Sequence, residues 1–326
     1  MMKPAIPSSF VAVLAAVAFA APLGHVAAQD YPRKSVRIVV PYAAGGYTDV
    51  IARQVGNGLQ SALGQPFIID NRPGAATAMG AEHVAAAPPD GYTLMMTSTG
   101  TTFSLTPLAT PNLRYRYDQF APVALVVRQP LMLVASPQFP SSNVKELVAY
   151  GKASPGKINW ATQGLGGTSH LVGELFRALA GVDMLAIHYK GSAPANVDLM
   201  AGRADLHFDG IGTAIPNVTS KKLKGIAVTS EKRMAVVPDI PTFVEAGLDK
   251  MVAYSTYGIL APSGTPAAII NKLNEQINRW TKDNTVQLGR AGGEVNAMTP
   301  EQFGKMMIDD MELWRKVIAP LNLKFE

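Results

Sequence analysis

The sequence predicts an α/β protein of two domains, each a mixed, mostly parallel sheet flanked by helices, with two strands crossing between them. Three observations support this expectation. Short apolar runs alternate with amphipathic stretches of helical length, and glycine-rich polar loops follow several of those runs. The chain has 326 residues, which is enough for two separate cores. Alternating strands and helices are typical of a parallel sheet that is covered on both faces.

Residues 1–28 have the composition of a signal peptide. Lys3 gives a positive start, Phe10–Ala21 is an apolar segment, and Val26–Ala28 is a run of small residues typical of a cleavage site. We therefore expect export, with cleavage after about Ala28. An uncleaved N-terminal anchor is the alternative, although a bilayer span needs roughly 20 apolar residues and this segment is shorter.

Composition excludes several classes of function. The chain has no cysteine, so disulfides, thiol catalysis and cysteine metal sites are ruled out. Its formal net charge is +5, but the basic residues are dispersed, so we expect no nucleic-acid binding. The five histidines lack metal-ligand spacing, and we expect no metal site.

The first predicted unit follows strand–helix–strand–helix–strand order. Its strands are expected at Val36–Val40, Pro66–Asp70 and Tyr92–Thr97, and its helices at Val50–Leu63 and Ala75–Ala87. The order indicates a parallel sheet, in which ligands sit beyond the carboxyl ends of the strands.

Two polar loops fall at such strand ends, Pro41–Asp49 and Ser98–Thr102. In the first loop, Gly45 and Gly46 free the backbone just before a helix begins. Unpaired N–H groups and the positive end of a helix dipole suit a carboxylate or a phosphate.

A second α/β unit follows, and its loop Thr162–His170 repeats the glycine-rich turn before a helix. The expected helices are Val144–Ala153, Ser169–Ala180 and Ala193–Met200, and the expected strands are Lys157–Ala161, Met184–His188, Ala204–Phe208 and Leu223–Thr229. We expect two crossings, near Ala121–Val134 and Val252–Leu260, to form a hinge. Residues 105–119, which precede the first crossing, are expected to be irregular.

The predicted domain boundaries follow from these crossings. Residues 29–128 form the first part of domain 1, residues 129–252 form domain 2, and residues 253–326 return to domain 1. The late helices, Ala267–Lys282 and one from Thr299 to about Val317, are expected to pack on domain 1.

Enzyme hypotheses find little support. Ser169, His170 and Asp209 suggest a hydrolase, but adjacent side chains diverge on a helix and no G-x-S-x-G motif is present. Gly164-Leu165-Gly166 is half of a dinucleotide fingerprint, and Ser169 replaces its third glycine. We therefore expect neither catalysis nor a cofactor.

Short motifs spread along the whole mature chain carry a family resemblance. They include Val39-Val40-Pro41-Tyr42 with Gly45-Gly46 and Asp49, Asn71-Arg72-Pro73-Gly74, Asp90-Gly91-Tyr92-Thr93-Leu94, Gly167-Thr168-Ser169-His170-Leu171, Tyr189-Lys190-Gly191, Pro238-Asp239-Ile240-Pro241-Thr242 and Thr299-Pro300-Glu301-Gln302-Phe303. In order and number they resemble the Bug (Bordetella uptake gene) family, the periplasmic solute-binding components of tripartite tricarboxylate transporters.

The resemblance implies a periplasmic-binding-protein-like, Venus-flytrap fold in a monomer that closes on a small organic carboxylate and delivers it to the permease subunits. It implies that one carboxylate is held between two turn–helix segments. The ligand-binding residues it implies are Tyr42, Gly45, Gly46, Tyr47, Thr48 and Asp49 in domain 1, Gly164, Gly167, Thr168, Ser169 and His170 in domain 2, and Ser98, Thr99 and Asp209 at further cleft positions. The family often has a proline and a third glycine where this chain has Ala43, Ala44 and Tyr47.

Other interpretations of these residues stay open. Thr48 and Thr168 would have a purely structural role if they only cap helices. Asp49 orients its loop or binds a water or a ligand ammonium, and Asp209 either contacts ligand or holds a turn with Gly210.

For His170, packing is favoured over acid–base chemistry, and Tyr47 is either exposed or part of a pocket wall. The alternative function is a sensory protein that presents a carboxylate to a signalling receptor. Dicarboxylates, tricarboxylates, amino acids and aromatic acids all fit the sequence.

Overall fold

The computed structural model describes residues 30–109, 112–165 and 167–318. The predicted signal peptide lies outside these residues. Among the helices of the described part, none combines the length and the apolar character needed to cross a membrane.

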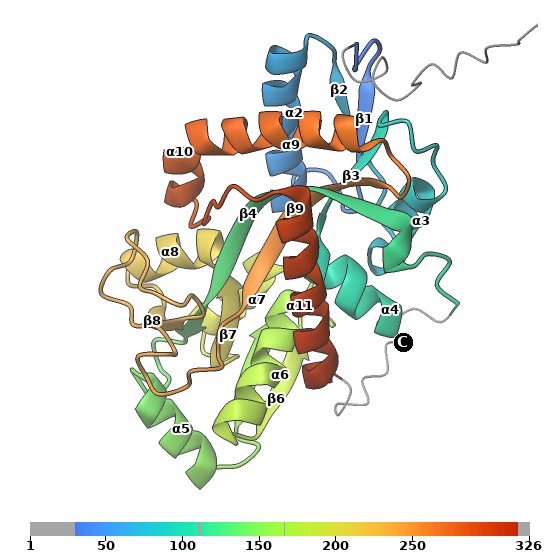
Figure 1. Ribbon diagram of the computed structural model, residues 1–326. Helices are drawn as coiled ribbons and strands as arrows, with labels where there is room; N and C mark the ends of the chain where they lie inside the picture. The colour runs from blue at the N-terminus through green and yellow to red at the C-terminus, as the bar shows by residue number, and fades with distance from the viewer. Residues whose placement is uncertain (1–29, 110–111, 166, 319–326) are drawn as a thin grey trace, which may run out of the picture.

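Lobe 1 is built on the first sheet (Figure 1). Strand β1 (Val36–Val40) pairs in parallel with β2 (Phe67–Asn71) and β3 (Thr93–Ser98), and β9 (Tyr254–Pro262) runs antiparallel to β3. The sheet is buried by side chains of α2 (Tyr47–Leu63), α3 (Ala78–Ala85) and α9 (Ala267–Asp283).

Lobe 2 repeats this plan with its own core. Strand β5 (Ile158–Thr162) is parallel to β6 (Met184–His188) and β7 (Leu206–Gly210). The last strand of the lobe, β8 (Lys224–Val228), pairs antiparallel with β4 (Phe120–Ala135). Its helices are α5 (Val144–Ala153), α6 (Thr168–Ala180), α7 (Ser192–Met200) and α8 (Ile211–Thr219).

Strand β4 joins the two sheets. Its first part pairs with β9 and its last part with β7 and β8, so one strand order, β2-β1-β3-β9-β4-β7-β5-β6, runs through the molecule. The sequence suggested two apolar runs interrupted at residues 128–130. The strand is continuous because Arg128, Gln129 and Pro130 pair with residues 254–256 of β9.

A third segment lies beside the two strands that connect the lobes. Arg128 and Glu294 exchange backbone hydrogen bonds of 3.0 and 2.7 Å. Gly292 lies directly against lobe 2, since a Cβ atom there would be 2.1 Å from Cγ2 of Ile211. The chain that follows α9 therefore contacts both lobes.

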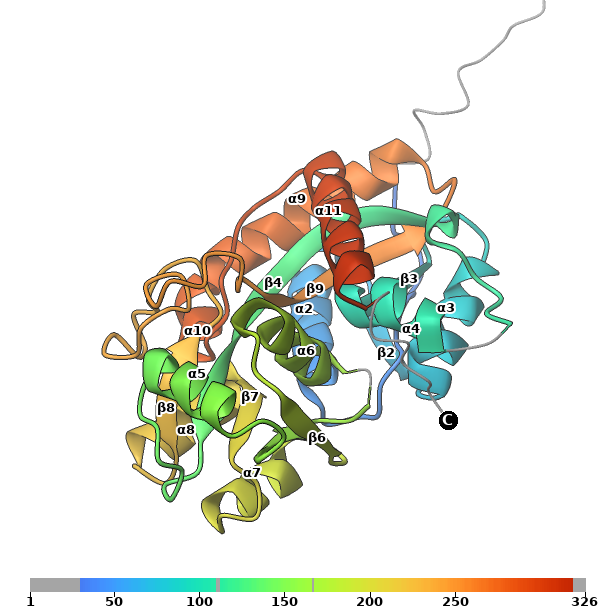
Figure 2. The ribbon, with the colours of Figure 1, turned by 90° about the horizontal axis from the view of Figure 1, so that it is seen from below.

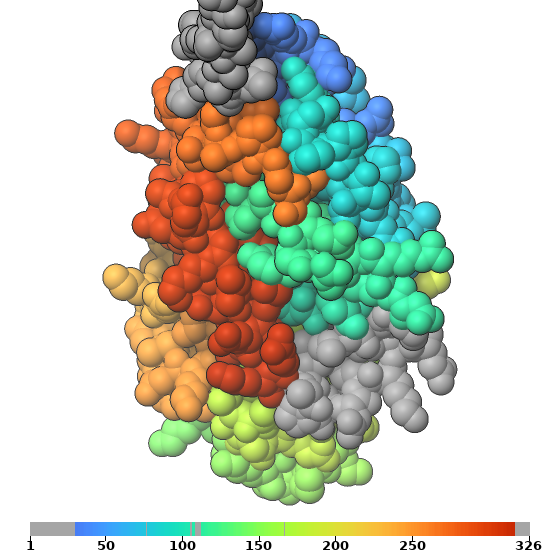
Figure 3. Space-filling model, turned by 45° about the vertical axis from the view of Figure 1, so that its right-hand side comes forward, coloured from blue at the N-terminus to red at the C-terminus, as the bar shows by residue number. Residues whose placement is uncertain are grey.

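Both late helices pack on lobe 1, as expected, but one of them also reaches lobe 2. Helix α11 (Pro300–Ile318) places Phe303 and Met307 in the core of lobe 1, but its Trp314 belongs to the core cluster of lobe 2. Helix α11 lies beside α6 in both ribbon views (Figure 2). In the space-filling view it runs down the surface to the yellow-green part of the molecule (Figure 3).

Several local expectations also need correction. The predicted helix 75–87 is split into η1 (Ala75–Thr77) and α3, because Thr77 adopts a left-handed φ of +84°. The stretch from residue 105 to 119, expected to be irregular, contains α4 (Thr106–Ala109) and the turn η3 (Tyr117–Gln119), after a π-helical turn η2 (Thr101–Leu105). Helices α8 and α10 (Thr285–Arg290) had no sequence-based prediction.

Candidate functional site

A cavity of about 620 Å³ lies between the lobes, with walls from both of them and a floor formed by β4 and β9. Six of the predicted ligand-binding residues line it: Tyr42, Gly46, Thr48, Ser98, Gly167 and Thr168. The two glycine-rich turns expected to share one ligand therefore border the same space.

Four helices begin at this cavity. Each has a glycine N-cap that lines it: Gly46 for α2, Gly167 for α6, Gly191 for α7 and Gly210 for α8. No side chain caps any of the four starts. First-turn amides without a protein acceptor and aligned helix dipoles together favour an anion.

Thr48 and Thr168 do not cap these helices. Thr168 is the first residue of α6 and Thr48 is the second residue of α2, so the purely capping interpretation is wrong for both. Both residues line the cavity, and a threonine hydroxyl can donate or accept a hydrogen bond.

The charge balance of the walls is positive. Among the described residues that line the cavity, Lys190 is the charged one and none has a carboxylate. Lys190 makes no hydrogen bond or ion pair with another residue of the described part of the chain. Within that part, no group of three histidine, aspartate or glutamate side chains is placed to hold a metal ion.

Asp49 lies beneath the first turn and outside the cavity lining. Its buried carboxylate accepts hydrogen bonds from the Gly45 amide at 2.9 Å, from Arg53 at 2.9 and 3.0 Å, and from Asn71 at 3.0 Å. Burial alone would raise its pKa, but the bonds from Arg53, Gly45 and Asn71 hold the pKa of Asp49 below its usual value. Of the roles left open, the geometry supports loop orientation.

Asp209 has the corresponding place in lobe 2. Its carboxylate has no exposed surface and accepts from Gln163 at 3.3 Å, Ser192 at 2.7 Å, Asn196 at 2.7 Å and Thr213 at 2.6 Å. It does not line the cavity, and its bonds join the β5–α6 loop to the starts of α7 and α8. Asp209 therefore holds the turns of lobe 2 in position without lining the cavity.

His170 and Ser169 are buried behind the second turn. The His170 ring stacks on Trp160 at a centroid distance of 5.7 Å and meets the edge of His188 at 4.8 Å. Burial, with His188 and Arg177, lowers the pKa of His170 to about 4. The Ser169 hydroxyl is also buried and has no hydrogen-bond partner among the described residues, and neither residue lines the cavity.

The other predicted residues support the walls from outside. Tyr47 packs its ring 5.0 Å from that of Tyr257, which does line the cavity. Thr99 donates to the carbonyl of Thr256 at 3.3 Å. Gly45 and Gly164 adopt φ values of +87° and +142°, which only glycine adopts readily, and so shape the turns.

Comparison with known proteins agrees with this geometry. The family model described as "Tripartite tricarboxylate transporter family receptor" matches residues 51–323. The chain belongs to this family. Protein BugT of Bordetella pertussis is 32% identical over 316 residues, which cover 96% of each chain.

Solved structures of relatives share the fold. The periplasmic binding protein BugD is 35% identical with a TM-score of 0.75, over 90% of this chain and 99% of that one. Rpa4515 of Rhodopseudomonas palustris, solved with adipate, is 32% identical with a TM-score of 0.78, over 89% and 97%. MatC from the same organism, solved with malate, is 33% identical with a TM-score of 0.75, over 88% and 100%.

These findings confirm the predicted Bug-family resemblance and the two-domain fold. Family members and structural neighbours are periplasmic solute-binding proteins rather than enzymes, so the chain is a solute-binding protein and the hydrolase hypothesis falls.

Several lining residues were not predicted: Gln129, Gln163, Lys190, Gly191, Gly210 and Tyr257. Lys190-Gly191 and Gly210 each follow a predicted strand, so the same strand–glycine–helix signal used for Gly45-Gly46 was present there. Gln129 belongs to no motif, and Gln163 lies in the predicted loop Thr162–His170 but was not singled out there; only the folded chain brings both to the cavity floor.

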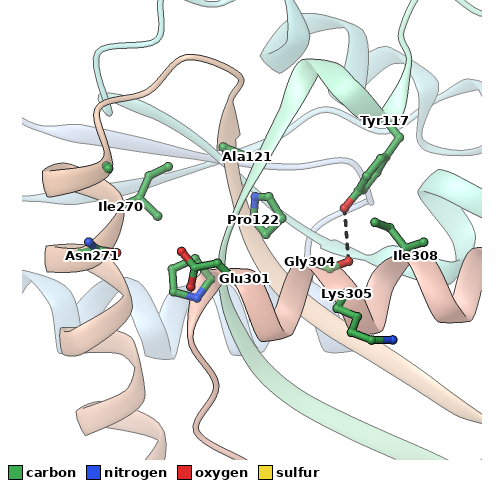
Figure 4. A pocket seen from close by; sticks show the side chains of 11 residues that line it. Tyr117, Ala121, Pro122, Ile270, Asn271, Glu301, Gly304, Lys305 and Ile308 are labelled. Carbon is green, nitrogen blue, oxygen red and sulfur yellow. Dashed lines mark hydrogen bonds between the residues drawn. The ribbon is translucent and has the colours of Figure 1, made fainter.

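A second cavity, of about 520 Å³, lies between α9 and α11 (Figure 4). Its walls are mostly apolar, with Ala121, Pro122 and Ile270, and Tyr117 donates to the carbonyl of Gly304 at 3.4 Å across one side. None of the predicted ligand-binding residues lines it.

Proposed function

We propose that this receptor captures a small organic carboxylate between its lobes, closes on it as a monomer, and delivers it to the membrane subunits of a tripartite tricarboxylate transporter. The observation that carries the proposal is the convergence of four uncapped helix starts, from both lobes, on a cavity whose lining has a lysine and no carboxylate. Neighbours solved with adipate and malate support the ligand class.

Closure follows from the division of the site between two lobes. We propose that the hinge separates residues 29–128 and 253–326 from residues 129–252, as the sequence suggested. Each lobe alone offers part of the anion's hydrogen bonds, so only the closed form satisfies them all, and ligand shifts the population toward it. The cleft positions Tyr42, Ser98, Thr48, Gly46, Gly167 and Thr168 are the proposed contacts.

The binding claim is tested by calorimetric titration with succinate, malate, adipate and citrate. Ala44→Asp, at an exposed lining position in lobe 1, and Thr168→Asp in lobe 2 add a negative charge at each turn. Ala44→Asn and Thr168→Asn are the matched neutral controls. We expect each aspartate variant to weaken binding at least tenfold relative to its asparagine partner, about 1.4 kcal/mol. Equal affinities for the Asp and Asn members of both pairs would contradict the proposal.

Delivery is tested by uptake of the radiolabelled acid in cells that lack the gene. We expect uptake to fall and to return with the wild-type chain but not with Thr168→Asp. Unchanged uptake with altered transcription would instead favour the sensory function.

A further inference from the structure

Two glutamine side chains border the cavity at neighbouring positions. Gln129 lies on β4 and is 6% exposed, and Leu131, two residues along the strand, pairs with Gly210 of β7. A Cβ atom on Gly210 would lie 3.9 Å from Nε2 of Gln163. Both amides therefore meet the cavity around the same part of its floor.

The orientation of each amide is fixed by its protein partner. Nε2 of Gln129 donates to the carbonyl oxygen of Ala291 at 3.0 Å, and Nε2 of Gln163 donates to the Asp209 carboxylate at 3.3 Å. A carbonyl oxygen and a carboxylate only accept hydrogen bonds, so neither amide can be turned round without losing its bond.

Oε1 of each amide is consequently an acceptor at a fixed position, and each Nε2 keeps a second N–H. Neither Oε1 atom takes a hydrogen bond from a described residue. A carbonyl oxygen that is left without a donor when the lobes close weakens binding, because it has lost its water and gained no partner. The two Oε1 atoms at the floor therefore favour a donor on the ligand, while the helix starts around the cavity favour an anion.

Asp209 adds to the preference for a donor. Among the described residues it forms no ion pair with a lysine or arginine, and its basic neighbour is His207, at 4.0 Å. Burial lowers the pKa of His207 against the raising effect of Asp209, so the imidazole is neutral. The negative charge behind Gln163 polarises that amide and favours a positive or hydrogen-bearing group on its open side.

We propose that the ligand carries a hydrogen-bond donor, a hydroxyl or an ammonium group, in addition to its carboxylate, and that Gln129 and Gln163 accept from it. This inference rests on the proposed carboxylate-binding function and narrows its ligand class to hydroxy or amino acids. A site built to pair a hydroxyl rejects the analogue without it more strongly than a hydrophobic pocket rejects a missing methylene.

The test uses matched acids that differ in one group. Succinate, malate and aspartate share a four-carbon skeleton and carry no donor, a hydroxyl and an ammonium, respectively. Glutarate with 2-hydroxyglutarate and glutamate, and butyrate with 3-hydroxybutyrate, cover other lengths and a single carboxylate. We expect the donor-bearing member of at least one set to bind at least tenfold more tightly than its plain member, and the hydroxyl and ammonium arms identify the donor.

Three variants connect the preference to the floor. Gln129→Met and Gln163→Met keep the length of the side chain and remove the acceptor, and Gln60→Met, at an exposed position on α2, is the control. In each floor variant we expect the affinities for the donor-bearing and the plain acid to differ by less than threefold, because only binding of the donor-bearing acid is weakened. We expect Gln60→Met to leave the ratio of the two affinities unchanged. If one floor variant fails to fold, the other still tests the inference. Thermal unfolding shows whether each variant is folded.

The outcomes separate the two proposals. If plain acids bind as tightly as their donor-bearing partners, or if both floor variants keep the preference, the inference is wrong and carboxylate capture stands. If no acid of any set binds, carboxylate capture fails, and the inference fails with it.

Discussion

The two lobes support their helix starts in different ways. In lobe 1, Asp49 holds the Gly45 turn and is ion-paired with Arg53, whose side chain is 50% exposed. In lobe 2, Asp209 has no exposed surface and is satisfied by four neutral side chains from three segments. Both carboxylates are buried, but one is paired with a half-exposed arginine and the other has no charged partner among its hydrogen-bond donors, so they should respond differently to substitution and to pH.

The largest difference is expected from removing the two carboxylates. Asp209→Ala leaves the buried Asn196 amide and the Ser192 and Thr213 hydroxyls without their acceptor, so we expect a loss of about 3–5 kcal/mol in the free energy of unfolding. Urea titration at pH 7 measures it. A loss no greater than that of Asp49→Ala would contradict the comparison.

Acid should weaken lobe 2 through His170. The folded pKa of about 4 lies below the usual value near 6.5, so the unfolded chain binds a proton between these limits and the native chain does not. Stability is complete above about pH 6.5 and falls as the pH drops toward 4, by about 3 kcal/mol from this residue. Urea titrations of the wild type and His170→Gln at pH 7 and pH 4.5 measure how much the free energy of unfolding falls between the two pH values. We expect the fall to be smaller in the variant. An equal fall in the wild type and the variant would show that His170 is not the source of the acid sensitivity.

Lobe 1 should lose its Asp49 contribution only at lower pH. Because the folded pKa of Asp49 is below its usual value near 3.9, its stabilisation is present above that value and is lost as the pH falls through the folded pKa. We expect Asp49→Asn to cost about 1–2 kcal/mol at pH 7 and progressively less as the pH falls below the usual value of the Asp pKa. A cost that does not change with pH would exclude the charge as its origin. The measurement is urea unfolding across that range.

The smallest effect is expected at the turn itself. Gly45 has a φ of +87°, and a Cβ atom added there would have no other atom within 4 Å. Gly45→Ala therefore meets no clash and costs only the strain of the left-handed conformation, about 1–2 kcal/mol. Gly46→Ala, at an extended backbone position, is the control. We expect a lower melting temperature for Gly45→Ala than for Gly46→Ala, and equal values would show that the turn relaxes freely.

Much of the fold could be predicted because each element carries a local signal. The strand β1 and the helix α5 have the bounds that the sequence predicts, and α11 begins one residue after the predicted start at Thr299. The continuity of β4 through Pro130 and the placement of Trp314 in lobe 2 depend on contacts with distant segments, and no local pattern reports these.

In the candidate site, too, the residues with a local sequence pattern could be predicted and those that depend on distant contacts could not. The glycine turns were visible because a strand that ends in glycine before a helix is a local pattern. Gln129 and Gln163 were not, because their role depends on Ala291 and Asp209, which are distant in sequence. The sequence predicted Asp209 at a cleft position, but only its four hydrogen bonds in the structure show that it supports the turns and does not line the cavity.

Closure of the two lobes on one acid is the central claim, and a distance between them tests it most directly. The chain has no cysteine, so Val50→Cys on α2 and Val197→Cys on α7, 42% and 53% exposed, accept spin labels at these two positions alone. With an acid shown by calorimetry to bind the labelled protein, we expect the inter-label distance to shorten and its distribution to narrow. An unchanged distribution at saturating ligand would contradict capture by closure.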